Sequence, residues 1–198
     1  MRARMRIVAG ELGGRVLRAP HGAATRPTSE KVRQALFNIL GPPAEDLHVL
    51  DLFAGSGALG LEALSRGAAS ATFVERARPA LIALRGNLDA LAVGDRARVV
   101  ATDVAGFLAG AALGPGPAWS WIFLDPPYAA GVVTAALAAL PAARLAPEAI
   151  VVVEHAHREP PPDRAGFLLR TDLRRYGDTS LSWYRPVPAS TPAAEPPP

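Results

Sequence analysis

The segment Val49–Gly60 constrains the fold of this chain more than any other. An apolar run that contains Asp51 and Phe53 breaks at two glycines and then continues as an Ala/Leu pattern. This order of residues predicts a buried strand, a tight turn and a helix. Gly55 and Gly57 allow the backbone to turn sharply and leave no Cβ between it and a ligand. The first N–H groups of the helix then face the crevice beyond the strand, so the segment predicts a ligand-binding loop.

Two kinds of cofactor are compatible with this loop. The pattern Gly55-x-Gly57-x-x-Gly60 matches the dinucleotide fingerprint, and Glu75 lies at the usual distance for binding ribose hydroxyls. Asp51, however, lies in the strand end, four residues before the first glycine. A carboxylate there suits the cationic amino-acid end of S-adenosylmethionine better than it suits a pyrophosphate. The loop therefore favours S-adenosylmethionine and leaves a nicotinamide oxidoreductase as an alternative.

Length and composition indicate one globular domain. The chain has 198 residues, of which 49% are hydrophobic, and no apolar run approaches the length of a membrane span. The basic amino terminus is not followed by the apolar core of a signal peptide, so we expect a cytoplasmic protein. The absence of cysteine excludes disulfides and thiolate zinc sites. Nothing in the pattern demands a dimer, and we expect a monomer.

Basic charge is concentrated at the front of the chain. Residues 1–33 carry eight basic and two acidic side chains, a net charge of +6, whereas the whole chain has a net charge of only +3. The asymmetry suits a polyanion such as nucleic acid. The side chains predicted to contact it are Arg4, Arg6, Arg15, Arg18, Arg26, Lys31 and Arg33.

The segments before the glycine loop predict an extension to the core. Residues 7–17 predict two short strands around a Gly-Gly turn, which we interpret as an appendage and a candidate substrate clamp. Residues 28–40 predict a helix that ends at Gly41-Pro42-Pro43, with a packing role for Phe37. Its expected apolar stripe consists of Val32, Ala35, Leu36, Ile39 and Leu40. Residues 1–43 are therefore predicted to form a basic, nucleic-acid-binding extension.

Five apolar runs alternate with helical segments and predict a parallel sheet covered on both faces. In chain order, the runs begin at residues 49, 71, 98, 121 and 149. Residues 167–186 break the alternation and predict a closing β-hairpin. The expected fold is α/β, a doubly wound, mostly parallel, seven-stranded sheet over residues 44–186, followed by a disordered Pro/Ala-rich tail over 187–198. The runs end in acidic residues, at the edge where such folds bind ligands; these residues are Asp51, Glu75, Asp103, Asp125 and Glu154.

The segment Asp125-Pro126-Pro127-Tyr128 directly follows the fourth apolar run. Its prolines stiffen the loop and remove backbone donors, which leaves carbonyls free. The Asp125 carboxylate and the Pro126 carbonyl can each accept a hydrogen from a planar amino group, and Tyr128 can stack on that group. Such contacts draw the nitrogen lone pair out of conjugation and direct it at an incoming methyl group. Alone, such a segment is more often a structural proline turn, but combined with the Asp51 motif about 70 residues upstream it predicts a methyltransferase that acts on an amino nitrogen.

The two motifs resemble those of class I S-adenosylmethionine-dependent methyltransferases that act on amino nitrogens. More narrowly, the chain up to about residue 186 resembles the bacterial 16S ribosomal RNA guanine-N2 methyltransferases, the small-subunit methyltransferase D family. The segments that carry the resemblance are 6–10, 15–17, 26–40, the Asp51 and Asp125 motifs, and 176–179.

The resemblance implies methylation of one guanine of 16S rRNA in the head of the small ribosomal subunit, with the assembled particle preferred over naked RNA. The positions matched to cofactor binding are Asp51, Phe53, Ala54, Gly55, Gly57, Glu75, Arg76, Asp103, Val104 and Asp125, and those matched to the guanine are Asp125, Pro126 and Tyr128. Within the first set, the resemblance assigns Glu75 to the ribose hydroxyls and Asp103 with Val104 to the adenine.

Three alternatives stay open at this point. The Asp125 loop serves any planar amine, so adenine N6 in DNA or RNA and a glutamine side-chain amide are alternative substrates. A nicotinamide oxidoreductase and a binding protein without catalysis are the other two. No metal is predicted, because the four histidines lack convincing ligand partners. His155 and His157 are the nearest candidates, and we interpret them as surface polar residues.

Overall fold

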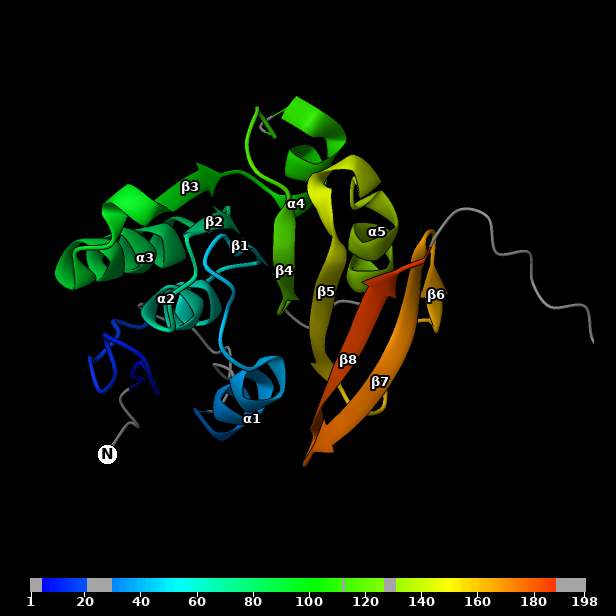
Figure 1. Ribbon diagram of the computed structural model, residues 1–198, viewed down its shortest axis with the longest axis horizontal. Coiled ribbons are helices and arrows are strands. Elements are labelled where there is room, and N and C mark those ends of the chain that lie inside the picture. Colours follow the sequence, from blue (N-terminus) through cyan, green and yellow to red (C-terminus); the bar gives the residue numbers. More distant parts are fainter. Residues whose placement is uncertain (1–4, 21–29, 112, 127–130, 188–198) are drawn as a thin grey trace, which may run out of the picture.

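A computed structural model describes residues 5–20, 30–111, 113–126 and 131–187 (Figure 1). The strands are β1 His48–Leu52, β2 Ser70–Glu75, β3 Ala97–Ala101, β4 Trp119–Leu124, β5 Leu145–Ala156, β6 Arg164–Ala165, β7 Leu168–Tyr176 and β8 Thr179–Pro186. The helices are α1 Glu30–Leu40, α2 Ala58–Ser65, α3 Arg78–Leu91, α4 Val104–Gly106 and α5 Val132–Ala139, with short helical turns at Gly94–Arg96, Phe107–Ala111 and Ala142–Arg144.

All strands form one sheet in the order β3-β2-β1-β4-β5-β8-β7-β6. Strands β1 to β5 are parallel, and β8, β7 and β6 follow with antiparallel pairing. The predicted doubly wound α/β class is confirmed. Over the described residues the sheet has eight strands rather than the predicted seven, because β6 adds a two-residue edge too short to leave a pattern in the sequence.

Each face of the sheet supports its own apolar core. On one face, Phe37 of α1 packs edge-on against Trp121 and Phe123 of β4, at centroid distances of 6.0 and 5.7 Å. The intervening Ile122 and the terminal Leu124 face the second core, which α5 covers. Because successive side chains of a strand point to opposite faces, β4 is apolar throughout. The packing role predicted for Phe37 is confirmed.

Helix α2 lies very close to β2. A Cβ at Gly60 would approach the ring of Phe73 to 2.3 Å, so only glycine permits this distance between the helix and the strand. The close approach fixes the position of α2, which begins directly after the glycine loop.

The predicted front hairpin is smaller than expected. Among the described residues, its two sides form a single β-bridge, between Arg6 and Val16, rather than two strands. Backbone hydrogen bonds from Ile7 N to Arg15 O at 2.9 Å and from Leu17 N to Met5 O at 2.8 Å join the two sides. Nor is it an appendage. Ile7 and Leu17 are buried in the core that contains α1, α2 and α3.

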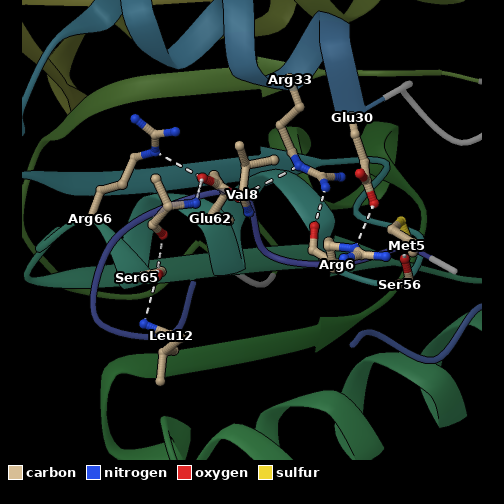
Figure 2. Close-up of polar contacts among 12 residues, drawn as sticks. Met5, Arg6, Val8, Leu12, Glu30, Arg33, Ser56, Glu62, Ser65 and Arg66 are labelled. Atoms are coloured by element: carbon tan, nitrogen blue, oxygen red, sulfur yellow. Dashed lines mark hydrogen bonds and ion pairs between the residues drawn. The ribbon is translucent and has the colours of Figure 1, made fainter. Parts of the chain in front are cut away.

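Glu62 of α2 holds the hairpin in place (Figure 2). Its buried carboxylate accepts hydrogen bonds from the backbone N–H groups of Val8 and Ala9 at 2.7 and 3.0 Å. The same carboxylate pairs with Arg66 at 2.8 Å and with Arg33 at 3.6 Å. The Glu62 carboxylate thus accepts hydrogen bonds from two backbone N–H groups of the hairpin and forms ion pairs with two arginines.

Arg33 corrects one prediction of a nucleic-acid contact. Its side chain is fully buried, pairs with Glu62 and donates to the backbone carbonyl of Arg6. Burial lowers the pKa of Arg33, and the Glu62 carboxylate is the main influence that opposes this shift. Arg33 is a structural residue, because a polyanion has no access to it. The buried stripe of α1 accordingly consists of Val32, Arg33, Leu36 and Phe37.

Several predicted positions fall outside the described residues. These are Arg4, Arg26, Tyr128 and residues 188–198 of the predicted tail. Val187, where that tail was expected to begin, donates its N–H to Phe167 O at 2.8 Å and so still belongs to the fold. Among the described residues, no helix combines the length and apolar character needed to cross a membrane.

Candidate functional site

The predicted acidic residues gather at one edge of the sheet because β1, β2 and β4 are parallel and in register. Leu52 pairs with Val74 of β2 and with Leu124 of β4, so the three strands end at one level. Glu75 and Asp125 each follow those partners by one residue. Both carboxylates influence the titration of Asp51, which places the three acids within electrostatic reach of one another.

The loop after β1 has the conformation that its glycines predict. Phe53, Gly55 and Gly57 have φ values of 63°, 56° and 85°, in the left-handed region that favours glycine. Gly57 has a second constraint, because a Cβ there would lie 2.5 Å from Leu84 Cδ1. Ala54 is buried, and its N–H donates to Val74 O at 3.0 Å. The loop is therefore held between β2 and α3.

Asp51 is the most buried acid of this edge, with 1% of its surface exposed. Its Oδ2 accepts the N–H of Gly60 at 2.9 Å, which ties the end of β1 to α2. Burial raises the pKa of Asp51 to about 7, with smaller increases from Asp125 and Glu75. The ionised form of Asp51 is thus disfavoured by burial and by two neighbouring acids. A positively charged ligand bound here would stabilise that ionised form.

Glu75 closes the loop from the side of β2. One carboxylate oxygen accepts the N–H of Gly55 at 2.9 Å, and the other accepts the N–H groups of Arg76 and Ala77 at 2.8 and 2.7 Å. The Gly55 N–H, which a phosphate would use in a dinucleotide loop, is thus directed at a carboxylate.

The remaining predicted positions surround this edge. Asp103 caps the short helix α4 by accepting the N–H of Gly106 at 2.8 Å, and Val104 is buried behind it. Pro126 is buried next to Asp125, and Glu154 lies within β5 opposite Leu181 of β8. The structure therefore brings Asp51, Glu75 and Asp125 together at the ends of adjacent strands, with Asp103 after β3 farther along the same edge.

Asn87 is a structural residue of this region that sequence analysis missed. It is buried on α3, donates to Ser56 O at 2.9 Å and exchanges two hydrogen bonds with the backbone of Arg18. The side chain joins the glycine loop to the end of the front hairpin. The sequence does hint at this role, because Asn87 is a polar residue within the buried stripe of α3. The other members of that stripe are apolar and include Leu84, Leu88 and Leu91.

The histidines differ from expectation in one respect. His155 is buried rather than on the surface, and its Nε2 lies 2.8 Å from Ser182 Oγ. His157 lies 3.0 Å from Ser180 Oγ. Burial lowers the pKa of His155, which favours the neutral ring. Within the part of the chain that the structure describes, no three His, Asp or Glu side chains group closely enough to hold a metal ion.

Comparison with known proteins identifies the family. The family model described as "Conserved hypothetical protein 95" matches residues 5–185. The chain belongs to this family. It is 43% identical over 151 residues to the Ribosomal RNA small subunit methyltransferase D of Escherichia coli K12, which covers 76% of this chain and 74% of that protein. It is 37% identical over 182 residues to the Bacillus subtilis protein named "Putative rRNA methyltransferase YlbH", with coverage of 91% and 98%.

A solved structure supports the same placement. The protein described as "Putative methyltransferase yhhF from Escherichia coli" superposes with a TM-score of 0.79 at 37% identity, over 93% of this chain and 98% of that one. The predicted resemblance to small-subunit methyltransferases D is confirmed, and the protein is a methyltransferase with the Rossmann-like fold.

Proposed function

We propose that this methyltransferase transfers a methyl group from S-adenosylmethionine to the exocyclic N2 amine of a guanine in 16S rRNA, within the small ribosomal subunit or its assembly intermediate. The observation that carries the proposal is the position of Asp125 and Pro126 at the end of β4, directly beside the buried Asp51 and its glycine loop at the end of β1. An acceptor for a planar amine thus adjoins a site suited to a cation.

The acidic edge supports S-adenosylmethionine as the cofactor. This molecule carries positive charge on its sulfonium and its amino group, and either charge would offset the cost of burying Asp51. A pyrophosphate would instead meet the carboxylates of Asp51, Glu75 and Asp125, while the Gly55 N–H is already bound by Glu75. The acids therefore weigh against the nicotinamide alternative.

S-adenosylmethionine supplies an electrophilic methyl group. In this mechanism, the carboxylate of Asp125 and the carbonyl of Pro126 accept the two amine hydrogens of the base and hold its nitrogen in line with that group. The contribution of these residues is positioning and alignment of the lone pair. A strong general base is not required, because the methylated nitrogen cation loses its proton readily.

The substrate is inferred from the relatives and from the front of the chain. The Escherichia coli relative is named as a ribosomal RNA small subunit methyltransferase. Arg6, Arg15, Arg18 and Lys31 are exposed, which keeps basic charge on the surface of the front segment although Arg33 is buried and Arg6 pairs with Glu30 at 3.5 Å. We place the RNA contact on these side chains.

Labelled S-adenosylmethionine tests the proposal. The purified protein is offered small ribosomal subunits from a strain that lacks this methylation, and in parallel naked 16S RNA, duplex DNA and a release-factor protein. Label recovered as N2-methylguanosine in subunit RNA supports the proposal. Label recovered only as N6-methyladenine or methylglutamine would replace the guanine with another planar amine, and binding without transfer would favour a non-catalytic protein.

The raised pKa of Asp51 predicts a pH-dependent cofactor affinity. Because Asp51 takes up a proton near pH 7, the affinity for S-adenosylmethionine should fall as the pH decreases from 8 to 6. Asp51→Asn should bind S-adenosylmethionine on the order of tenfold to a hundredfold more weakly at pH 8, where the lost contact is charged, and should show little pH dependence. Titration calorimetry at pH 6, 7 and 8 measures both effects.

Asp51→Asn is expected to weaken cofactor binding but to stabilise the protein when no cofactor is bound. The folded state binds the Asp51 proton more tightly than the unfolded state, in which the pKa of Asp51 is close to the ordinary aspartate value of 3.8. The free energy of unfolding therefore decreases as the pH rises from about 4 to about 7. Asp51→Asn, whose amide oxygen can still accept the Gly60 N–H, should melt at a higher temperature than wild type at pH 8. A lower melting temperature would contradict the assigned cost of burying this charge.

A further inference from the structure

We propose that the exposed face of α3, together with the adjoining arm of the front hairpin, binds the phosphate backbone of the RNA substrate. We call the surface formed by Arg15, Arg18, Arg78 and Arg85 the arginine ridge. This inference rests on the proposed function and deepens it, because it extends the RNA contact from the front segment onto the domain that holds the glycine loop.

The spacing along α3 puts its two arginines on one face. Arg78, Ile82, Arg85 and Asp89 follow one another at intervals of three or four residues, and all four are exposed. The opposite side of the helix is buried in the core. Seven residues of helix separate the two guanidinium-bearing positions by about 10 Å along the axis, which suits contacts with separate phosphates of one strand.

The hairpin adds its arginines to the same surface. Arg15 Nη2 donates to Ala90 O near the end of α3 at 2.8 Å. The backbone N–H and carbonyl of Arg18 form hydrogen bonds with the Asn87 side chain. The Arg18 side chain lies next to Gly86, where a Cβ would come within 3.1 Å of Arg18 Nη1. Because Gly86 carries no side chain, Arg18 can lie against the helix between the levels of Arg85 and Ala90.

The charges of the ridge are available to a ligand. Three other surface arginines are paired with carboxylates: Arg96 with Glu11, Arg174 with Asp172, and Arg185 with Glu148. In contrast, the side chains of Arg18, Arg78 and Arg85 form no hydrogen bond or ion pair with any other residue that the structure describes. Unpaired arginines in a row complement a polyanion, whereas paired ones largely neutralise each other.

One end of the arginine ridge lies close to the candidate active site. Helix α3 begins at Arg78, three residues after Glu75, so one end of the ridge lies at the edge where the acids gather. Figure 1 shows the front hairpin beside α2 and below α3, away from β7 and β8. RNA lying along α3 would therefore approach the strand ends from the side of β2, with its phosphates on the ridge.

The test compares two double variants that lose the same charge. Arg78→Ala/Arg85→Ala removes two ridge arginines, and Arg174→Ala/Arg185→Ala removes two paired arginines from β7 and β8. For each protein, we would measure the melting temperature, the affinity for S-adenosylmethionine, the KM for small subunits, and the dependence of RNA binding on salt.

The ridge variant should raise the KM for subunits on the order of tenfold and reduce the slope of log affinity against log salt by about 2, with S-adenosylmethionine affinity unchanged. A KM and a salt slope equal to those of the control variant would overturn the inference. So would a loss confined to assembled subunits with the salt slope on naked RNA unchanged, because it would indicate a protein contact. Failure of wild-type protein to methylate subunit RNA would instead reject the proposed function itself.

Discussion

Asp125→Ala is expected to lower the rate of methyl transfer to small-subunit RNA by at least 10²–10³-fold, roughly the effect of removing one preorganised hydrogen-bonding group from an active site. Affinity for S-adenosylmethionine should persist. Asp125 is one of the charges that raise the pKa of Asp51, so its removal favours the ionised form of Asp51 at neutral pH. Single-turnover rates with labelled cofactor, together with calorimetric titration of the cofactor, measure the two quantities separately.

Asp125→Asn is the matched control, because the amide oxygen still accepts a hydrogen from the target amine. We expect this variant to retain far more activity than Asp125→Ala. Equal inactivity of the two variants would show that Asp125 must accept a proton, which contradicts a mechanism based on lone-pair alignment. Loss of cofactor binding in Asp125→Ala would instead reassign Asp125 to the cofactor.

Glu62→Ala is expected to destabilise the protein by about 3–5 kcal/mol, the usual cost of removing one member of a buried ion pair. The variant leaves Arg33 as an unpaired buried cation and deprives the N–H groups of Val8 and Ala9 of their acceptor. For a chain of this size, such a loss corresponds to a decrease in melting temperature of roughly 10 °C. Calorimetry measures this decrease, and hydrogen exchange should show earlier exposure of residues 5–17.

Arg33→Met provides the comparison for Glu62. It removes the buried cation, while Glu62 keeps Arg66 and both backbone donors, so the loss should be smaller than in Glu62→Ala. The double variant completes a cycle that isolates the interaction between the two side chains. An unchanged melting temperature in Glu62→Ala would mean that apolar contacts alone hold the hairpin.

The central strands and the glycine loop could be predicted because each leaves a local signature. A buried parallel strand is apolar on both faces, and the positive φ values at Gly55 and Gly57 require residues of that type. The acids at the strand ends could be predicted to gather because parallel strands share one carboxyl edge. Their individual hydrogen bonds, such as that from Gly55 to Glu75, depend on tertiary geometry and left no such signal.

The role of Arg33 could not be predicted from charge counting. The formal charge counted over a segment does not depend on whether a side chain faces solvent or the core. In addition, Glu62, the partner of Arg33, lies 29 residues further along the chain. Glu62 does carry a signal, since it is the only charged residue in helix α2, whose other residues are apolar except for Ser65. A carboxylate in such surroundings needs a cation or several donors, and a basic residue on the helix before β1 is a candidate.

The docking of the hairpin on Glu62 has a consequence for the order in which the chain acquires its structure. The contacts of Val8 and Ala9 with Glu62 span more than 50 residues. During synthesis, the front segment therefore leaves the ribosome well before the helix that will bind it has been made. Until then the N–H groups of Val8 and Ala9 have no carboxylate to bind, and Arg33 has no buried anion to pair with. The burial of Arg33, and with it the docking of the basic front segment on the domain, therefore has to wait for Glu62 of α2.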